Sequence, residues 1–179
     1  MRRWLSLNTN QHLDAPRNKR HNAFAMSHAE VVAIYVAPER GAPTVEVDAV
    51  DVVAAQGVVG DRKFIDAPDE DKPSRRQLTL IEAEEIEAFN DSFDAGMTDG
   101  DFRRQVVTRG VRLNDLVNRE FAVGEVRLRG TMLCEPCKYL AQKTHRQLLW
   151  GLKGRGGLCA EVLEGGKVST GDAISIERD

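Results

Sequence analysis

The stretch that decides the fold is residues 157–177, "GLCAEVLEGGKVSTGDAISIE". Apolar and polar residues alternate here in short runs, and two glycine turns, Gly165–Gly166 and Gly171–Asp172, separate the runs. Alternation with a period of two is the pattern of a half-buried strand, and glycine gives the backbone the freedom that a tight turn needs. We therefore predict two or three short strands at this end of the chain.

Similar short strands are predicted upstream. Residues 119–130, "REFAVGEVRLRG", are predicted to form a hairpin that turns at Gly124, and residues 31–36, "VVAIYV", a buried strand. Residues 43–53, "PTVEVDAVDVV", alternate with one slip, which predicts a bulge. Short strands joined by glycine turns favour a mostly β fold with a few helices (α+β), arranged as a compact mixed-strand β-barrel.

The helices are expected between these strands. Residues 77–93, "QLTLIEAEEIEAFNDSF", pass from a strand pattern to a helix pattern, and Thr79 and Glu82 have the spacing of a capping box. Residues 137–152 are a second helical candidate. Residues 66–76, "DAPDEDKPSRR", are polar and contain prolines, which predicts a mobile loop.

The composition limits the function. The chain has 179 residues and a net charge of −3, and a protein that binds nucleic acid carries a clear positive excess, so no nucleic-acid partner is expected. No apolar run approaches the roughly 20 residues of a membrane span, so no membrane partner is expected. The 3 cysteines are too few and too widely spaced for a disulfide framework. They indicate thiol chemistry in a reducing compartment, which we interpret as the cytoplasm.

The first residues differ from the rest of the chain. Residues 1–24 contain five lysines or arginines against one acid, Asp14, and they lack the apolar core of a secretory signal. We interpret residues 1–30 as a basic leader, either disordered or an extension from an upstream start codon, with Met26 as the true start. A transit peptide is the alternative. Residues 31–179 are then predicted to form a single domain.

The pair in "CEPC", Cys134 and Cys137, allows several readings. A structural zinc site needs four ligands, and the nearby candidates are His145 and Cys159. Cys159, however, lies in a strand pattern among apolar neighbours and looks like a core thiol. A thiol-exchange pair would sit in a βαβ context, which the pattern does not contain. A pair that merely packs is also open.

A further reading is a single activated thiolate at Cys137. This residue follows Pro136, a good first-turn residue, at a point where a helix would begin, and Lys138 is adjacent. Free backbone N–H groups and a nearby cation lower the pKa of a thiol. A soft thiolate suits a soft metal such as molybdenum.

Arginines gather at several strand ends and glycine turns. Because the guanidinium group binds phosphate and carboxylate through two donors, clusters of this kind predict an anion site. The clusters are Arg75–Arg76, then Arg103, Arg104, Arg109 and Arg112, then Lys153 and Arg155.

Taken in order, these motifs resemble the MOSC domain, the C-terminal domain of molybdenum-cofactor sulfurases, which also occurs as a stand-alone bacterial protein. The resemblance covers about residues 31–178. It is carried by "GVVGD" at 57–61, by the arginine-led strand "RRQVVTRG" at 103–110, by "CEPC", and by the closing "GGKVSTGD" at 165–172.

The resemblance implies a site for the molybdenum cofactor, a pterin that carries a phosphate and a dithiolene-held metal; pyridoxal phosphate is not expected. The single essential cysteine of the family, as metal ligand or sulfur carrier, falls on Cys137. The basic and polar positions that contact the cofactor suggest Arg75, Arg76, Arg104, Thr108 and Arg109. The family often has Arg-Asn or Arg-x-Asn where this chain has Arg104–Gln105.

The resemblance also implies an activity. Relatives of this kind reduce N-hydroxylated bases and amidoximes, with electrons from a separate flavin or iron–sulfur partner. This chain has too few cysteines to hold its own cluster, so such a partner is expected. We therefore expect a molybdenum-dependent oxidoreductase acting on a small molecule, with Cys137 as catalytic residue and metal ligand. The alternative is a module that binds the cofactor, or carries persulfide sulfur on Cys137, without redox turnover.

Overall fold

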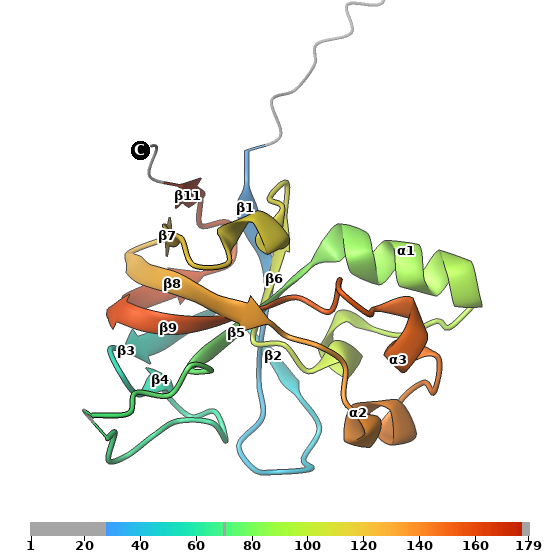
Figure 1. Cartoon of the computed structure of the whole chain (residues 1–179), viewed down its shortest axis with the longest axis horizontal. Helices are drawn as coiled ribbons and strands as arrows, with labels where there is room; N and C mark the ends of the chain where they lie inside the picture. The colour runs from blue at the N-terminus through green and yellow to red at the C-terminus, as the bar shows by residue number, and fades with distance from the viewer. Residues whose placement is uncertain (1–27, 70, 177–179) are drawn as a thin grey trace, which may run out of the picture.

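The computed structural model describes residues 28–69 and 71–176. This part of the chain contains eleven strands, three α-helices and two short 3-10 helices, with the α-helices gathered at one end of the molecule (Figure 1). In chain order the elements are β1 (Glu30–Val36), β2 (Val45–Val47), β3 (Ala49–Val53), β4 (Gly57–Val58), β5 (Leu78–Glu82), α1 (Ala83–Phe93), η1 (Asp99–Phe102), β6 (Val106–Arg109), η2 (Leu113–Leu116), β7 (Glu120–Val123), β8 (Val126–Leu133), α2 (Lys138–Lys143), α3 (Leu148–Gly151), β9 (Leu158–Glu164), β10 (Gly166–Ser169) and β11 (Ile174–Ile176).

The strands form two sheets. The larger has eight strands in the order β11-β7-β8-β9-β5-β6-β1-β2, and the smaller has three in the order β10-β3-β4. Strands β5 and β6 run parallel, and the other neighbours are antiparallel. The expected class, mostly β with a few helices and mixed strand directions, is confirmed.

The expected closed barrel is not confirmed. The larger sheet curls until its β11 end meets β1, where Val31 N donates to Asp172 O at 2.9 Å and Glu30 pairs with Ala173 in an isolated bridge. In the described residues neither sheet forms a ring of paired strands, because β2 and β11 remain the edges of the larger sheet.

The segment 43–53 is two strands and not one strand with a bulge. The chain bends at Asp48, so β2 pairs with β1 in the larger sheet while β3 pairs with β4 and β10 in the smaller one. Alternation reports which side chains are buried, but it does not report which neighbour a strand pairs with. The slip in the pattern therefore marks a crossing from one sheet to the other.

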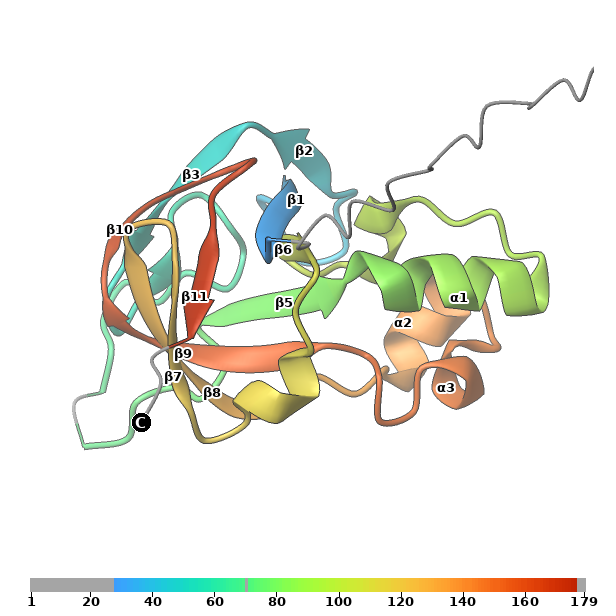
Figure 2. The same ribbon diagram turned by 90° about the horizontal axis from the view of Figure 1, so that it is seen from above.

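The core has two parts, one inside the curl of the sheets and one between the larger sheet and the helices (Figure 2). Strands β5 and β6 separate them. Leu80 and Val106 face the first part and Ile81 and Val107 face the second, and all four are 0% exposed. A strand covered on both faces needs apolar residues at consecutive positions, which explains the runs in these two strands.

The expected short strands at the C-terminal end are confirmed as β9, β10 and β11. The hairpin at 119–130 is confirmed as β7 and β8, and its turn residue Gly124 has a φ of 56°. The expected helix within 137–152 is present as two short helices, α2 and α3. The strand expected at 31–36 is β1.

The expected capping box at Thr79 and Glu82 is wrong. Thr79 is a strand residue whose hydroxyl donates to Gln105 Oε1 at 2.8 Å, and Glu82, the N-cap of α1, makes no side-chain cap bond. The capping box of this region lies at Thr98 and Asp101, which begin η1. Spacing alone did not distinguish the two places, because a buried threonine can find a partner across a sheet.

The expected basic leader at 1–30 lies almost entirely outside the described residues, which begin at His28. Within the described ranges, no helix has both the length and the apolar character needed to cross a membrane.

Candidate functional site

Cys137 lies where the curled sheet gives way to the helices. Strand β8 ends at Leu133, and the chain then runs through Pro136 to α2, whose N-cap is Cys137. The Leu140 N–H donates to Cys137 Sγ at 3.4 Å, and the Cys137 side chain is exposed. The sequence pattern predicted this position, just ahead of a helix.

Cys137 opens onto a cavity of about 270 Å³, which we call the thiol cavity. Four separate segments of the chain contribute cationic side chains to its wall. The six cationic residues are Arg40, Arg62, Lys63, Arg76, Arg103 and Arg104. Among the described residues that line it, the one carboxylate belongs to Glu135, and both of its oxygens accept from Gly154 N at 3.1 Å. The thiol cavity therefore has a large excess of positive charge.

A buried aspartate holds the turn that carries Arg62 and Lys63. Asp61 is 4% exposed, and its carboxylate accepts from Ala37 N and from Lys63 N, both at 3.0 Å. Arg62 also reaches the same carboxylate, with Nη1 3.3 Å from Oδ2. Because these bonds tie the turn to the end of β1, the two cations project from a fixed backbone.

Gln105 connects this turn to the centre of the larger sheet. Its Nε2 donates to Asp61 Oδ1 at 3.0 Å, and its Oε1 accepts from both the N–H and the hydroxyl of Thr79 at 2.8 Å. Gln105 is 2% exposed, so this amide is an internal connector. Through Asp61, Gln105 thus helps to fix the turn that carries Arg62 and Lys63.

Arg104 is buried under the thiol cavity at 7% exposure. Its guanidinium donates to three backbone carbonyls, those of Phe102 at 3.0 Å, Gly156 at 2.9 Å and Cys134 at 2.7 Å. These bonds join the segment just before β6 to the "CEPC" segment and to the loop before β9. Arg104 therefore shapes the site as well as charging it.

Arg103, its neighbour, has a left-handed backbone with a φ of 57°. Such a conformation is uncommon for a residue with a side chain and costs of order 1 kcal/mol or more. The Nη1 of Arg103 donates to Ala42 O at 2.7 Å. The unusual backbone sends Arg103 toward the β1–β2 connection, whereas Arg104 turns into the core.

The cations in the thiol cavity disfavour one another's charge. Burial lowers the pKa of Lys63, and the nearby positive charges of Arg62 and Arg104 lower it further. Burial likewise lowers the pKa of Arg62, and Arg103 adds to that effect while Asp61 opposes it. An anion in the cavity would relieve this repulsion.

Cys134 also lines the thiol cavity and has an unusual environment. A hydrogen bond from the buried Cys159 thiol lowers the pKa of Cys134, and the positive charges of Arg104, Lys63 and Arg76 act in the same direction. Burial opposes them. The same contact raises the pKa of Cys159, so this pair holds one ionisable thiol beside one neutral donor.

The structure brings some of the sequence-predicted residues together and leaves others apart. Arg76 and Arg104 line the thiol cavity with Cys137. Arg75 lies outside it and donates from Nη2 to Thr131 O at 2.8 Å. Thr108 is 0% exposed, with its hydroxyl 3.3 Å from Ile81 O, and Arg109 pairs on the surface with Glu87 of α1.

The proposed zinc ligands are not assembled. In residues 28–69 and 71–176 no group of three or more His, Cys, Asp or Glu side chains is placed to hold a metal ion. The His145 ring packs edge-on against Phe89, with centroids 5.6 Å apart. The prediction that Cys159 is a core thiol is confirmed, at 0% exposure.

Sequence reasoning missed three of the cations that line the thiol cavity as site residues. Arg62 and Lys63 follow the G-x-x-G-D turn directly, and Arg40 precedes a glycine in the β1–β2 connection. The adjacent cations Arg62 and Lys63, directly after a glycine turn, were the sequence signal that could have identified these two as site residues. Of the described residues in the polar loop 66–76, only Arg76 lines the cavity.

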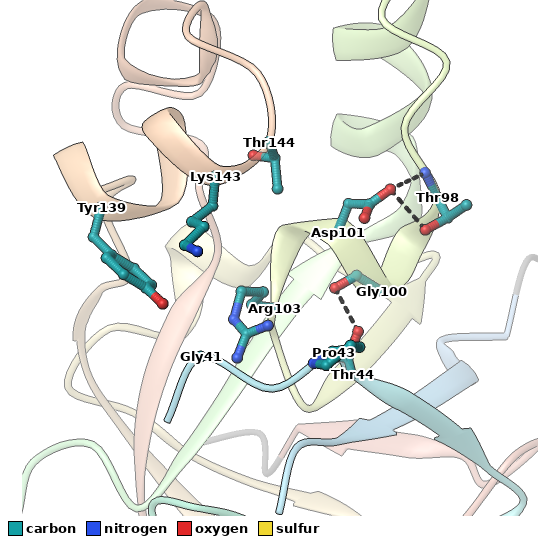
Figure 3. A pocket seen from close by; sticks show the side chains of 10 residues that line it. All are labelled: Gly41, Pro43, Thr44, Thr98, Gly100, Asp101, Arg103, Tyr139, Lys143 and Thr144. Atoms are coloured by element: carbon teal, nitrogen blue, oxygen red, sulfur yellow. Dashed lines mark hydrogen bonds between the residues drawn. The ribbon is translucent and has the colours of Figure 1, made fainter. Parts of the chain in front are cut away.

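A second cavity of about 280 Å³ adjoins the thiol cavity and shares Gly41, Arg103 and Tyr139 with it. Figure 3 shows Tyr139 and Lys143 reaching down from α2 toward Arg103, while Asp101 turns aside to Thr98. Both cavities therefore lie between α2 and the β1–β2 connection.

Comparison with solved structures shows the fold. The YuaD protein of Bacillus subtilis matches with a TM-score of 0.70 and 19% identity, over 82% of this chain and 93% of that one. YiiM of Geobacillus stearothermophilus matches with a TM-score of 0.61 and 15% identity, over 84% of this chain and 75% of that one. YiiM of Escherichia coli gives 0.60 and 18%, over 84% and 70%. A comparison with curated proteins returned no match.

The family comparison agrees with the topology and with the order of the motifs. A model of the MOSC domain matches residues 56–175, which run from β4 into β11 and include both cysteines of the thiol cavity. The chain belongs to the MOSC domain family.

Proposed function

We propose that this protein binds the molybdenum cofactor in the thiol cavity, with Cys137 as molybdenum ligand, and reduces N-hydroxylated small molecules. The family is generally associated with binding of this cofactor. One observation carries the proposal for this chain: an exposed thiol opens onto a cavity lined by six cationic side chains and one carboxylate. That combination suits a ligand with a soft metal at one end and a phosphate at the other.

The residues present fit such a ligand. Cys137 Sγ offers a soft donor at the mouth of the cavity, and Arg62, Lys63 and Arg76 offer charge for the phosphate. Burial is the main cause that lowers the pKa values of Lys63 and Arg62, and an anion in the cavity would favour the charged forms of both side chains. When bound, the cofactor would supply a metal centre able to pass two electrons to a substrate.

The overall reaction needs an electron donor outside this chain. Reduction of an amidoxime to an amidine breaks the N–O bond, consumes two electrons and two protons, and releases water. The 3 cysteines of the chain cannot provide a separate iron–sulfur cluster in addition to a metal ligand. We therefore propose a separate flavin or iron–sulfur protein as donor. The role of this chain is to bind and orient the reactants and to neutralise their negative charge.

A second function is supported by the exposure of Cys137. A thiol that faces solvent beside a cationic cavity can also carry a persulfide sulfur, or hold the cofactor for transfer without redox turnover. The two functions differ in what remains on Cys137 after purification, and the experiment below separates them.

The test is to produce the chain in a host that makes the cofactor and to measure molybdenum by elemental analysis in wild type, Cys137→Ser and Cys134→Ser. We expect stoichiometric metal in wild type, a loss of at least about tenfold in Cys137→Ser, and a milder loss in Cys134→Ser, because one metal–sulfur bond is removed in the first case. Circular dichroism of each variant confirms that folding is unchanged.

Metal in wild type together with turnover of benzamidoxime, given a chemical electron donor, supports the reductase. Metal without turnover, or an adduct of about 32 Da on Cys137 from one added sulfur, supports the carrier. A folded wild-type protein that contains neither metal nor adduct would contradict both functions. Equal losses in the two cysteine variants would contradict Cys137 as the single ligand.

A further inference from the structure

The second cavity holds donor groups that the fold does not use. Lys143, at the end of α2, and Arg103 both line it, and in the described residues neither has a carboxylate within salt-bridge distance. Figure 3 draws no hydrogen bond from the Tyr139 hydroxyl to the other residues that line this cavity. Unpaired donors with positive charge favour an anion over a cation or an apolar group.

The other polar groups of this cavity are already engaged. Asp101 Oδ2 accepts from both the N–H and the hydroxyl of Thr98 at 2.8 Å, so this carboxylate serves the start of η1. The hydroxyl of Thr44 donates to Gly100 O and that of Thr144 to Leu140 O, both at 2.9 Å. The remaining donors are therefore those of Lys143 and Tyr139 and the Arg103 nitrogens other than Nη1, which donates to Ala42 O. Figure 3 shows these three side chains converging on one side of the cavity.

The wall between the two cavities is thin and specific. Gly41 has a φ of 90°, and a Cβ built there would lie 3.3 Å from the Tyr139 hydroxyl, so the tyrosine stands closely over a backbone without a side chain. Arg103, held in its left-handed conformation, completes the wall. The two cavities therefore meet at Gly41, Arg103 and Tyr139, with Cys137 on one side and Lys143 on the other.

We infer that the second cavity is a substrate subsite that binds an anionic oxygen group, a carboxylate or a phosphate, of the molecule whose reactive end lies at Cys137. This rests on the proposed function, and it names the substrate class as acidic N-hydroxylated compounds. Arg62, Lys63 and Arg76 of the thiol cavity serve the phosphate of the cofactor. Lys143 of the second cavity, with Arg103 at the boundary that the two cavities share, selects the substrate.

The first test needs no cofactor. The full chain is labelled with ¹⁵N and titrated with inorganic phosphate, and amide shifts are followed in both cavities in wild type, Lys143→Gln and the matched surface control Lys167→Gln. We expect Lys143→Gln to weaken phosphate binding about fivefold at Thr98, Asp101 and Thr144, the size of one solvent-accessible charge pair. Shifts at Arg62 and Lys63 should persist, and Lys167→Gln should behave as wild type.

The second test uses the loaded protein and a matched pair of probes, benzamidoxime and 4-carboxybenzamidoxime. We expect Lys143→Gln to raise KM about fivefold for the carboxylated probe, to leave KM for the neutral probe unchanged, and to leave the molybdenum content unchanged.

Three results would overturn the inference. If phosphate causes no amide shifts around the second cavity in wild type, the cavity binds no anion. The same conclusion follows if phosphate binds Lys143→Gln there with the affinity of wild type. Loss of molybdenum in Lys143→Gln means that the cavity holds the cofactor and not the substrate. Because the phosphate titration uses cofactor-free protein, a negative result there is separate from any failure to bind molybdenum.

Discussion

At the scale of single residues, the three cysteines have three different environments. Cys137 is exposed, Cys134 is half-buried among cations, and Cys159 is fully buried. Their spacing in the sequence suggested a pair at 134 and 137, but the thiol that lowers the pKa of Cys134 is that of Cys159. The ionisation of Cys134 therefore depends on a residue in another strand.

This contact predicts the pH dependence of thiol alkylation. In a Cys137→Ser background, we expect iodoacetamide to modify Cys134 at a pH below the usual thiol range, since its lowered pKa leaves the thiolate present there. Cys159→Ala removes the hydrogen bond and should move the alkylation profile to higher pH. Mass spectrometry at a series of pH values measures both profiles. Coincident profiles would contradict the contact.

Two glycines in one loop predict different costs for the same substitution. Gly157 has a φ of 102°, and a Cβ there would lie 2.0 Å from Leu80 O, whereas at Gly154, with a φ of 72°, a Cβ would meet nothing within 4 Å. We expect Gly154→Ala to lower the free energy of unfolding by about 1–2 kcal/mol, from backbone strain alone. Gly157→Ala should cost about 4 kcal/mol, because β5 must also move. Urea unfolding measures both, and equal costs would contradict the close approach.

At the scale of elements, the site is assembled by buried polar side chains that connect strands to turns. Gln105, the residue before β6, links Asp61 in the turn after β4 to Thr79 in β5. Arg104 links the same segment to the "CEPC" segment and to the loop before β9. The cations of the thiol cavity are thus attached to the centre of the larger sheet.

Removal of this connector should affect both stability and binding. Gln105→Ala leaves the buried N–H and hydroxyl of Thr79 without their acceptor and removes one donor from Asp61, so we expect it to lower the free energy of unfolding by about 2–4 kcal/mol. Phosphate affinity at Arg62 and Lys63 should fall as well. Gln56→Ala, at an exposed amide that donates to Asp66 O at 3.2 Å, is the matched control and should cost about 0.5 kcal/mol. Similar costs in the two variants would argue against the connector.

At the scale of the whole molecule, positive charge is concentrated although the chain is acidic overall. The net charge is −3, yet six cationic side chains from four segments line the thiol cavity. Folding brings these charges together, and their repulsion opposes the folded state. An anion that binds the folded state alone offsets that repulsion.

Thermal stability should therefore depend on the kind of anion. We expect the protein to be more stable in phosphate than in sodium chloride at the same ionic strength. The free energy of unfolding should rise by about 2.7 kcal/mol when phosphate is present at roughly 100 times its dissociation constant. Arg76→Gln, in the thiol cavity, should reduce this gain. Arg127→Gln, which removes a surface pair with Glu120, should leave the gain unchanged. Calorimetry measures it, and an equal gain in all three proteins would contradict a localised anion site.

The sequence by itself determined the class of the fold. Short alternating runs around glycine turns predicted β7 to β11 closely, since burial on one face of a strand repeats every two residues. The order of the motifs also predicted the MOSC family, and the family model confirmed it. The spacing of "CEPC" and its proline placed Cys137 ahead of a helix, because local backbone chemistry sets where a helix begins.

Only the tertiary structure decided which charges share a cavity. Arg75 and Arg76 are neighbours in sequence, but one turns to Thr131 and the other lines the thiol cavity. Thr108 and Arg109 follow the same motif as Arg104, yet the first is buried in β6 and the second pairs with α1. Side-chain direction depends on strand pairing and on left-handed turns such as that at Arg103, and these are set by contacts between residues far apart in the chain.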